Sequence, residues 1–159
     1  MNRKLKNSIL FVCLNEPFGK SVSKSLAQSL SMHFADCKDL IEYDLFNSGE
    51  VLTQCGEEYY LMREQKVIKM TCNYENTLMF CGYDILNHNQ KTFEKYSTIV
   101  YLKLPKKLLS SEDKINIIAY EERNNELEKK ADVIVNLKRL NEKSALKEIC
   151  NVLGELQWI

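Results

Sequence analysis

The residues whose types and spacing most clearly suggest ligand binding are Gly19, Lys20 and Ser21, which follow an apolar run at residues 9–14. A glycine, a lysine and a hydroxyl in this order, between a strand and a helix, are typical of a loop that binds nucleotide phosphates. Backbone N–H groups and the lysine then hold the phosphates, and the hydroxyl holds Mg²⁺. We therefore take these three residues as the candidate cofactor-binding residues.

The residues just before this tripeptide differ from those of a phosphate-binding loop. Such a loop has the pattern G-x-x-x-x-G-K-[ST], and Leu14 stands where its first glycine is required. Glu16 brings a negative charge, Pro17 removes a backbone donor, and Phe18 adds bulk where phosphate should lie. The alternative is therefore a plain strand–turn–helix junction, in which the tripeptide is only a polar first turn.

Short apolar runs alternate with helical patterns along the rest of the chain. The predicted strands are residues 8–13, 33–36, 77–81, 98–102 and 131–135. The predicted helices are residues 21–33, 57–70, 121–130 and 144–156, and residues 104–114 form the most loop-like segment. Apolar runs without polar alternation are typical of strands covered on both faces, as in parallel sheets. The pattern predicts an α/β domain, with ligands bound at the carboxyl ends of the strands.

The composition limits the possible functions. A length of 159 residues predicts one domain spanning 1–159. Lys and Arg together number 22, as do Asp and Glu, so no general attraction to nucleic acid or anionic membrane is expected. No apolar run approaches the roughly 20 residues of a membrane helix. The basic start and residues 9–14 resemble a signal peptide only superficially, since the run is short and no cleavage site follows.

The six cysteines and two histidines predict no metal site. No cysteine pair has the CxxC spacing that zinc sites commonly use. Several cysteines lie in apolar runs, which favours reduced, buried thiols in a cytoplasmic protein. A redox role for an exposed cysteine is the alternative interpretation.

Five sequence blocks, in order, resemble those of the shikimate kinases. Residues 33–42 resemble "F-I-D-T-D-x-L-I-E", and residues 56–64 resemble "G-E-x-x-F-R-x-x-E". Residues 76–82 resemble the strand that leads to a triple glycine, and residues 100–102 resemble the fourth strand of the family. Glu122 and Arg123, followed by residues 130–135, resemble "E-R-x-P-L-Y-x-x-x-A-D-x-x-V".

The resemblance implies a three-layer domain of the P-loop kinase type, with a five-stranded parallel sheet flanked by helices. It also implies transfer of the ATP γ-phosphoryl group to a hydroxyl of shikimate, with Mg²⁺. Asp36 matches the first Asp of "D-T-D", which in the family helps to organise Mg²⁺ and the catalytic loop, so Asp36 is the candidate catalytic residue. The alternative role of Asp36 is to cap the helix that follows it, near Asp39.

The shikimate-binding positions of the family are only partly kept. The resemblance makes Arg123, Gly82 and Lys38 the candidate substrate-binding residues, but Lys38 stands where the family has an Asp. Leu61 stands where the family has an Arg, and residues 83–84 replace two of its three glycines. Each lost charge-assisted contact is worth about 1.5–3 kcal/mol. The side chains at 83–84 should also fill space that the family leaves for ligand.

The segment that closes over ATP in the family is also short here. Only residues 103–121 separate the fourth strand from the "E-R" helix, so about 20 residues are missing relative to the family. No "R-P-L" sequence occurs there to supply the lid arginine. Because phosphoryl transfer depends on positioning and positive charge, these losses predict a degenerate member without efficient ATP binding or shikimate phosphorylation.

Two interpretations remain. In the first, the domain is a scaffold that binds a partner protein or a small anion, with no cofactor. Convergence of Lys38, Arg123, Asp36 and Asp84 on one pocket would indicate a small-molecule ligand, and a packed pocket would favour a scaffold. In the second, the chain is a divergent active phosphotransferase that uses ATP and Mg²⁺ through Lys20.

Overall fold

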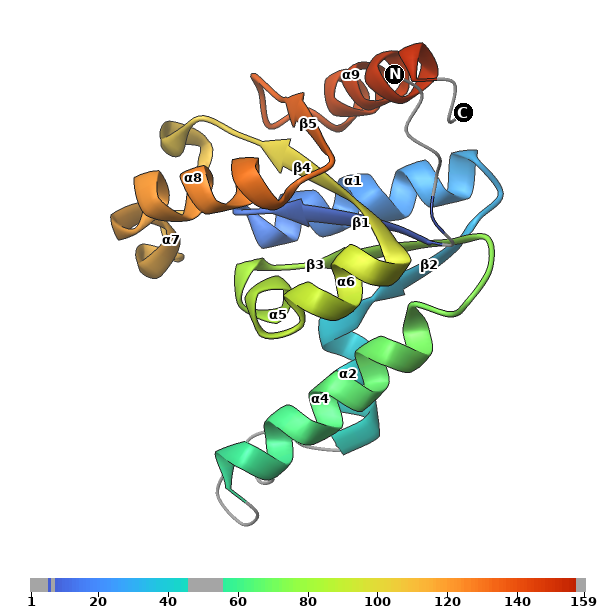
Figure 1. Cartoon of the computed structure of the whole chain (residues 1–159). Helices are drawn as coiled ribbons and strands as arrows, with labels where there is room; N and C mark the ends of the chain where they lie inside the picture. Colours follow the sequence, from blue (N-terminus) through green and yellow to red (C-terminus); the bar gives the residue numbers. More distant parts are fainter. Residues whose placement is uncertain (1–5, 7, 46–55, 157–159) are drawn as a thin grey trace.

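The computed structural model describes residues 6, 8–45 and 56–156. Five parallel strands form one sheet in the order β2-β3-β1-β4-β5. The strands are β1 (Ser8–Cys13), β2 (His33–Asp36), β3 (Thr77–Cys81), β4 (Ser97–Lys103) and β5 (Val133–Asn136). Figure 1 shows β1 in the middle of the sheet, so the chain that leaves its carboxyl end starts between the neighbouring strands β3 and β4.

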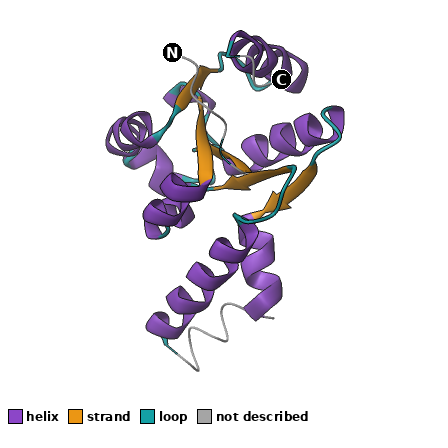
Figure 2. Ribbon diagram, turned by 45° about the vertical axis from the view of Figure 1, so that its right-hand side comes forward, coloured by secondary structure: helices purple, strands orange, loops and turns teal. Residues whose placement is uncertain are grey.

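Helices cover both faces of the sheet, which makes three layers (Figure 2). One face carries α1 (Glu16–Ser29) and α9 (Glu142–Glu155), whose apolar side chains pack on Ile9, Phe11 and Val100. The other face carries five further helices among the described residues, packed on strand residues such as Leu10 and Tyr101. These helices are α2 (Cys37–Leu45), α4 (Glu57–Thr71), α5 (Tyr83–His88), α6 (Gln90–Tyr96) and α8 (Tyr120–Lys130). Successive strand residues thus bury opposite faces, as the continuous apolar runs predicted.

The strand predictions are confirmed with small shifts. The runs at 8–13, 33–36 and 77–81 match β1, β2 and β3 residue for residue, and 98–102 lies inside β4. The predicted strand 131–135 begins too early, because Ala131 still closes α8 by donating its N–H to the Leu127 carbonyl. The loop-like segment 104–114 contains a 3₁₀ turn at Lys106–Leu108 and ends at α7 (Lys114–Ile118).

The first helix differs most from its prediction. It was expected at 21–33, but α1 begins at Glu16 and ends at Ser29. Asn15 caps it, since the Asn15 side chain accepts the backbone N–H of Phe18, and Pro17 lies in the first turn, where a missing N–H costs nothing. The other predicted helices agree with α4, α8 and α9 within two residues at each end. None of the described helices is long and apolar enough to cross a membrane.

Candidate functional site

The connection between β1 and α1 consists of Leu14 and Asn15 alone. The sequence predicted that Gly19, Lys20 and Ser21 end a loop and open a helix, and this prediction is wrong. All three lie inside α1, and the Gly19 N–H donates to the Asn15 carbonyl at 2.9 Å. That N–H is therefore part of the helix and is not free to bind a phosphate. The cause of the error is local: the capping Asn15 starts the helix before the residues that were taken for a loop.

Gly19 instead lets α1 lie close against the sheet. A Cβ atom at this position would stand 2.5 Å from the Cβ of Cys13 and 2.6 Å from the ring of Phe80. These neighbours belong to β1 and β3, the two strands beneath the start of the helix. The glycine is thus explained by packing, because any side chain would push the helix away from the strands.

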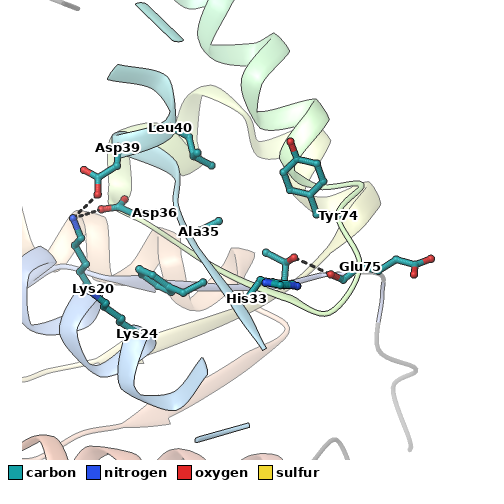
Figure 3. Close-up of a pocket in the computed structure, with 11 residues that line it drawn as sticks. Lys20, Lys24, His33, Ala35, Asp36, Asp39, Leu40, Tyr74 and Glu75 are labelled. Atoms are coloured by element: carbon teal, nitrogen blue, oxygen red, sulfur yellow. Dashed lines mark hydrogen bonds and ion pairs between the residues drawn. The ribbon is translucent and has the colours of Figure 1, made fainter. Parts of the chain in front are cut away.

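Lys20 and Ser21 make contacts in different parts of the molecule. The Lys20 ammonium lies 2.8 Å from Asp36 Oδ2 and 2.7 Å from Asp39 Oδ2, as Figure 3 shows. Hydrogen bonds to these two carboxylates raise the pKa of Lys20. Ser21 donates to Glu142 Oε2 at 3.1 Å, at the start of α9. The lysine and the hydroxyl therefore do not converge on a common point, as a nucleotide-binding pair must.

Asp36 caps a helix and pairs with Lys20. It ends β2, is 8% exposed, and accepts the backbone N–H of Lys38 at 3.1 Å, which caps the first turn of α2. Its second oxygen pairs with Lys20. The capping role expected as the alternative is therefore present. No contact of Asp36 tests its proposed catalytic role.

The carboxyl ends of the central strands open into a cavity of about 380 Å³. Its charged lining consists of four carboxylates against two lysines, and apolar contacts come from Phe80 and Pro17. The charged residues are Glu16, Asp36, Asp39, Glu42, Lys20 and Lys38. Since Lys20 is held by two of these carboxylates, the cavity has an excess of negative charge where a phosphate would require positive charge.

Glu16 lies against Gly82 in this cavity. A Cβ at Gly82 would stand 1.5 Å from Glu16 Oε1, so the glutamate takes the space that a larger residue would need. Burial raises the pKa of Glu16, the nearby Lys38 lowers it, and Asp113, Asp84 and Asp36 raise it further. The carboxylate thus occupies the place that the sequence assigned to the ligand of Gly82.

We expect the substitution Glu16→Gln to increase the free energy of unfolding by about 1 kcal/mol at neutral pH. The pKa of Glu16 is higher in the folded chain than its ordinary value of 4.5. The wild type therefore loses stability as pH rises from below 4.5 through the folded-state pKa, while the amide variant does not. Urea unfolding of both proteins between pH 3.5 and 7.5 measures this difference. A difference that stays constant with pH would contradict the burial of this carboxylate.

Arg123 of α8 is held by neighbours on α5 and α7. Its guanidinium carbon lies 4.2 Å from the centre of the Tyr83 ring, and its Nη1 donates to Asn116 Oδ1 at 2.7 Å. Its Nη2 is 3.7 Å from Asp84 Oδ1. The side chains expected to fill the family's ligand space therefore contact Arg123 itself. Arg123 and Asp84 do not line the cavity around Glu16, so only Asp36 and Lys38 of the four expected residues meet there.

The sequence analysis missed Asn116, which lies beneath this arrangement. The Asn116 amide donates to the Leu14 carbonyl at 2.9 Å and to Asp113 at 2.6 Å, and its oxygen accepts from Arg123. It thereby joins the end of β1 to the segment that follows β4. The capping pattern Asp113-x-x-Asn116 is visible in the sequence, but the contact with Leu14 spans 102 positions and has no local signal.

The cysteines of the described segments are free, and four of them are buried. Burial raises the pKa of Cys72 to about 11 and that of Cys13 to about 12, which makes both thiols poor nucleophiles. Cys150 is exposed, and Cys55 lies outside the described residues. Within residues 6, 8–45 and 56–156, no three metal-ligating side chains of His, Cys, Asp or Glu come together.

The fold and the position of the cavity define a single α/β domain of the P-loop kinase class. The sequence model of shikimate kinase matches residues 18–154. The chain therefore belongs to the shikimate kinase family, and the fold class expected from the sequence is confirmed.

Solved structures of shikimate kinases are similar across nearly the whole chain. That of Bacteroides thetaiotaomicron has a TM-score of 0.76 at 19% identity, covering 92% of this chain and 98% of that one. That of Acinetobacter baumannii, in complex with shikimate, has a TM-score of 0.67 at 17% identity and covers 96% and 95%. That of Aquifex aeolicus has a TM-score of 0.67 at 22% identity and covers 92% and 99%. No curated protein matches the chain in sequence. At these identities the likeness concerns the fold.

Proposed function

We propose that this chain is a non-catalytic member of the shikimate kinase family. It keeps the fold as a binding domain and has neither efficient ATP binding nor shikimate phosphorylation. The observation that carries the proposal is the start of α1 at Glu16, with only two residues between it and the end of β1. A phosphate site in this fold needs a loop of free N–H groups between these two elements, and here the backbone goes directly into a helix.

The charges at this end of the sheet support the same proposal. Phosphoryl transfer requires cations that stabilise the oxygens of the transferred group. Lys20, the candidate cation of the former loop, is paired with Asp36 and Asp39, and Glu16 adds a further carboxylate. A triphosphate would have to displace these carboxylates from Lys20 and enter a cavity with an excess of negative charge.

The residues at the shikimate-binding positions of the family also support the proposal. A carboxylate such as that of shikimate needs charge-assisted donors. Arg123 already donates to Asn116 and stacks on Tyr83, and Leu61 supplies no charge at the position of the family's arginine. Lys38 remains at the cavity as the cation without an ion pair among the described residues. A small anion or a partner protein are the ligands that this first interpretation allows.

Replacing Lys20 should affect stability and leave nucleotide affinity unchanged. We expect Lys20→Met to lower the free energy of unfolding by about 1–2 kcal/mol, because the largely buried Asp36 loses its ion partner. Lys24→Met, one helical turn further, is the control, since Lys24 has no ion pair within the described segments. Urea unfolding of both variants checks the prediction. Equal stability of the two variants would contradict a structural role for the Lys20 ion pairs.

The direct test of the proposed function is turnover. Purified protein is mixed with Mg-ATP and shikimate, and release of ADP is followed by a coupled assay, with an active shikimate kinase as positive control. We expect no ADP release above the rate without shikimate. Shikimate-dependent turnover that is abolished by Asp36→Asn would establish the alternative, a divergent phosphotransferase that uses ATP and Mg²⁺.

A further inference from the structure

A second cavity lies away from the carboxyl ends of the central strands, where the second half of α4 faces α5 and α6. Its volume is about 760 Å³, within the usual range for small-molecule sites. In Figure 1 these helices lie on the same side of the sheet. Except for Asn89, which is buried, the lining comes from polar or charged side chains that are partly or fully exposed. The proposed function makes no use of this cavity.

The charge of this cavity is opposite to that of the cavity around Glu16. Lys66 and Lys69, one turn apart on α4, line it together with Lys91 at the start of α6. None of the three lysines has an ion pair among the described residues. The one carboxylate in the lining, Glu94, accepts a hydrogen bond from the Gln90 amide at 2.7 Å. In a chain of zero net charge, three unpaired lysines around one cavity are a local concentration of positive charge.

His88 lines the cavity, and its imidazole ring is oriented by a buried glutamate. Its Nδ1 lies 3.4 Å from Oε2 of Glu64, a residue that is 1% exposed. The other Glu64 oxygen accepts from the Asn89 amide, and Oε2 has no hydrogen bond in the described part of the chain. A buried carboxylate that faces Nδ1 favours a proton on that atom. The Nε2 atom lies on the opposite side of the ring from Glu64, and the His88 side chain is 41% exposed.

We propose that this cavity binds a small phosphate ester. Lys66, Lys69 and Lys91 supply the positive charge that a phosphate dianion requires. With the proton on Nδ1, the Nε2 atom of His88 can accept a hydrogen bond from a hydroxyl group of the ester. The Gln65 amide and the Thr92 hydroxyl, which also line the cavity, offer hydrogen bonds to hydroxyl groups of the esterified carbon skeleton. The inference concerns different residues from those of the proposed function and does not depend on it.

Calorimetric titration with glycerol phosphate and with inorganic phosphate tests the proposal. We expect the wild type to bind glycerol phosphate with a Kd on the order of 1 mM at low salt, more tightly than inorganic phosphate. The variant Lys66→Gln/Lys69→Gln should weaken binding at least about tenfold. Lys143→Gln/Lys147→Gln, two exposed lysines on α9 with the same loss of charge, is the matched control and should change Kd less than about twofold.

Three results would overturn the proposal. The first is that neither compound gives heat at a concentration about twenty times the expected Kd. The second is equal weakening in the α4 variant and the α9 control, which would indicate a general charge effect. The third is binding to vesicles of phosphatidylglycerol without binding of glycerol phosphate, which would indicate a membrane surface instead of a soluble ester.

The same variants separate this site from a kinase site. If ATP binds through the second cavity, its affinity falls in Lys66→Gln/Lys69→Gln and is unchanged in Lys20→Met. If ATP binds at the start of α1, the two variants show the reverse. Failure of the phosphate-ester site and failure of the proposed function are therefore distinguishable.

Discussion

Gly19→Ala should lower the free energy of unfolding by about 1–2 kcal/mol. The added methyl group would stand 2.5 Å from the Cβ of Cys13 and 2.6 Å from the Phe80 ring, both in the core beneath α1. Overpacking of this kind costs typically 1–3 kcal/mol, and more where backbone must shift. The gain in helix propensity from glycine to alanine, about 1 kcal/mol, offsets only part of this cost. Equilibrium unfolding in urea measures the difference.

Gly154→Ala is the matched control for this substitution. Gly154 lies in α9, and a Cβ there would have no atom within 4 Å. Only the higher helix propensity of alanine then affects stability, so this variant should be more stable than the wild type by up to about 1 kcal/mol. If Gly19→Ala were as stable as Gly154→Ala, this result would contradict the close packing of α1 on the sheet. The packing explanation of Gly19 would then fail with it.

Arg123→Ala should lower the free energy of unfolding by about 2 kcal/mol. The substitution removes the contact with the Tyr83 ring, worth about 0.5–2 kcal/mol, and leaves Asn116 Oδ1 without its donor. Asn116 is 5% exposed, so water does not readily replace the lost hydrogen bond. Thermal and urea unfolding measure this loss.

Arg139→Ala is the control, because Arg139 is exposed and has no partner in the described part of the chain. Its stability should remain within about 0.5 kcal/mol of the wild type. Calorimetry with shikimate on the same variants separates structure from ligand binding. If Arg123→Ala kept full stability but removed a measurable affinity for shikimate, Arg123 would be an anion ligand and its structural role would be contradicted.

The sheet could be predicted from the sequence because its strands are continuous apolar runs. Residues 8–13 and 77–81 are buried at every position, so their pattern has no alternation that could be confused with an exposed strand. The edge strand β5 was harder to delimit. It begins at Val133 instead of residue 131, because the Ala131 N–H still donates to the Leu127 carbonyl and closes α8.

The start of α1 was predicted too late because the Gly-Lys-Ser tripeptide indicated a loop where Asn15 already caps the helix. Asn15 followed by Glu16 and Pro17 is typical of a helix N-terminus, with a capping side chain, an acidic first turn and an early proline. The Gly-Lys-Ser tripeptide suggested that the helix begins later. Local chemistry was sufficient to find the true start, and the tripeptide motif favoured a later one.

The contacts within the candidate site could not be predicted because they are long-range. Lys20 meets Asp36 and Asp39 only when α1 and the start of α2 lie side by side at the edge of the sheet. Ser21 meets Glu142 across 121 positions. Single residue types and their spacing do not specify such pairs. The sequence therefore identified the segments that carry the candidate residues, but not the partners that those residues have.

Titration calorimetry with Mg-ATP is the measurement that tests the central claim most directly, because the claim concerns whether phosphates can bind where α1 follows β1. The account predicts no heat for the wild type at nucleotide concentrations up to about 1 mM, which corresponds to binding weaker than about −4 kcal/mol. A tighter dissociation constant that is lost in Lys20→Met, and kept in Lys66→Gln/Lys69→Gln, would contradict it. That result would mean that the start of α1 rearranges to form a phosphate site.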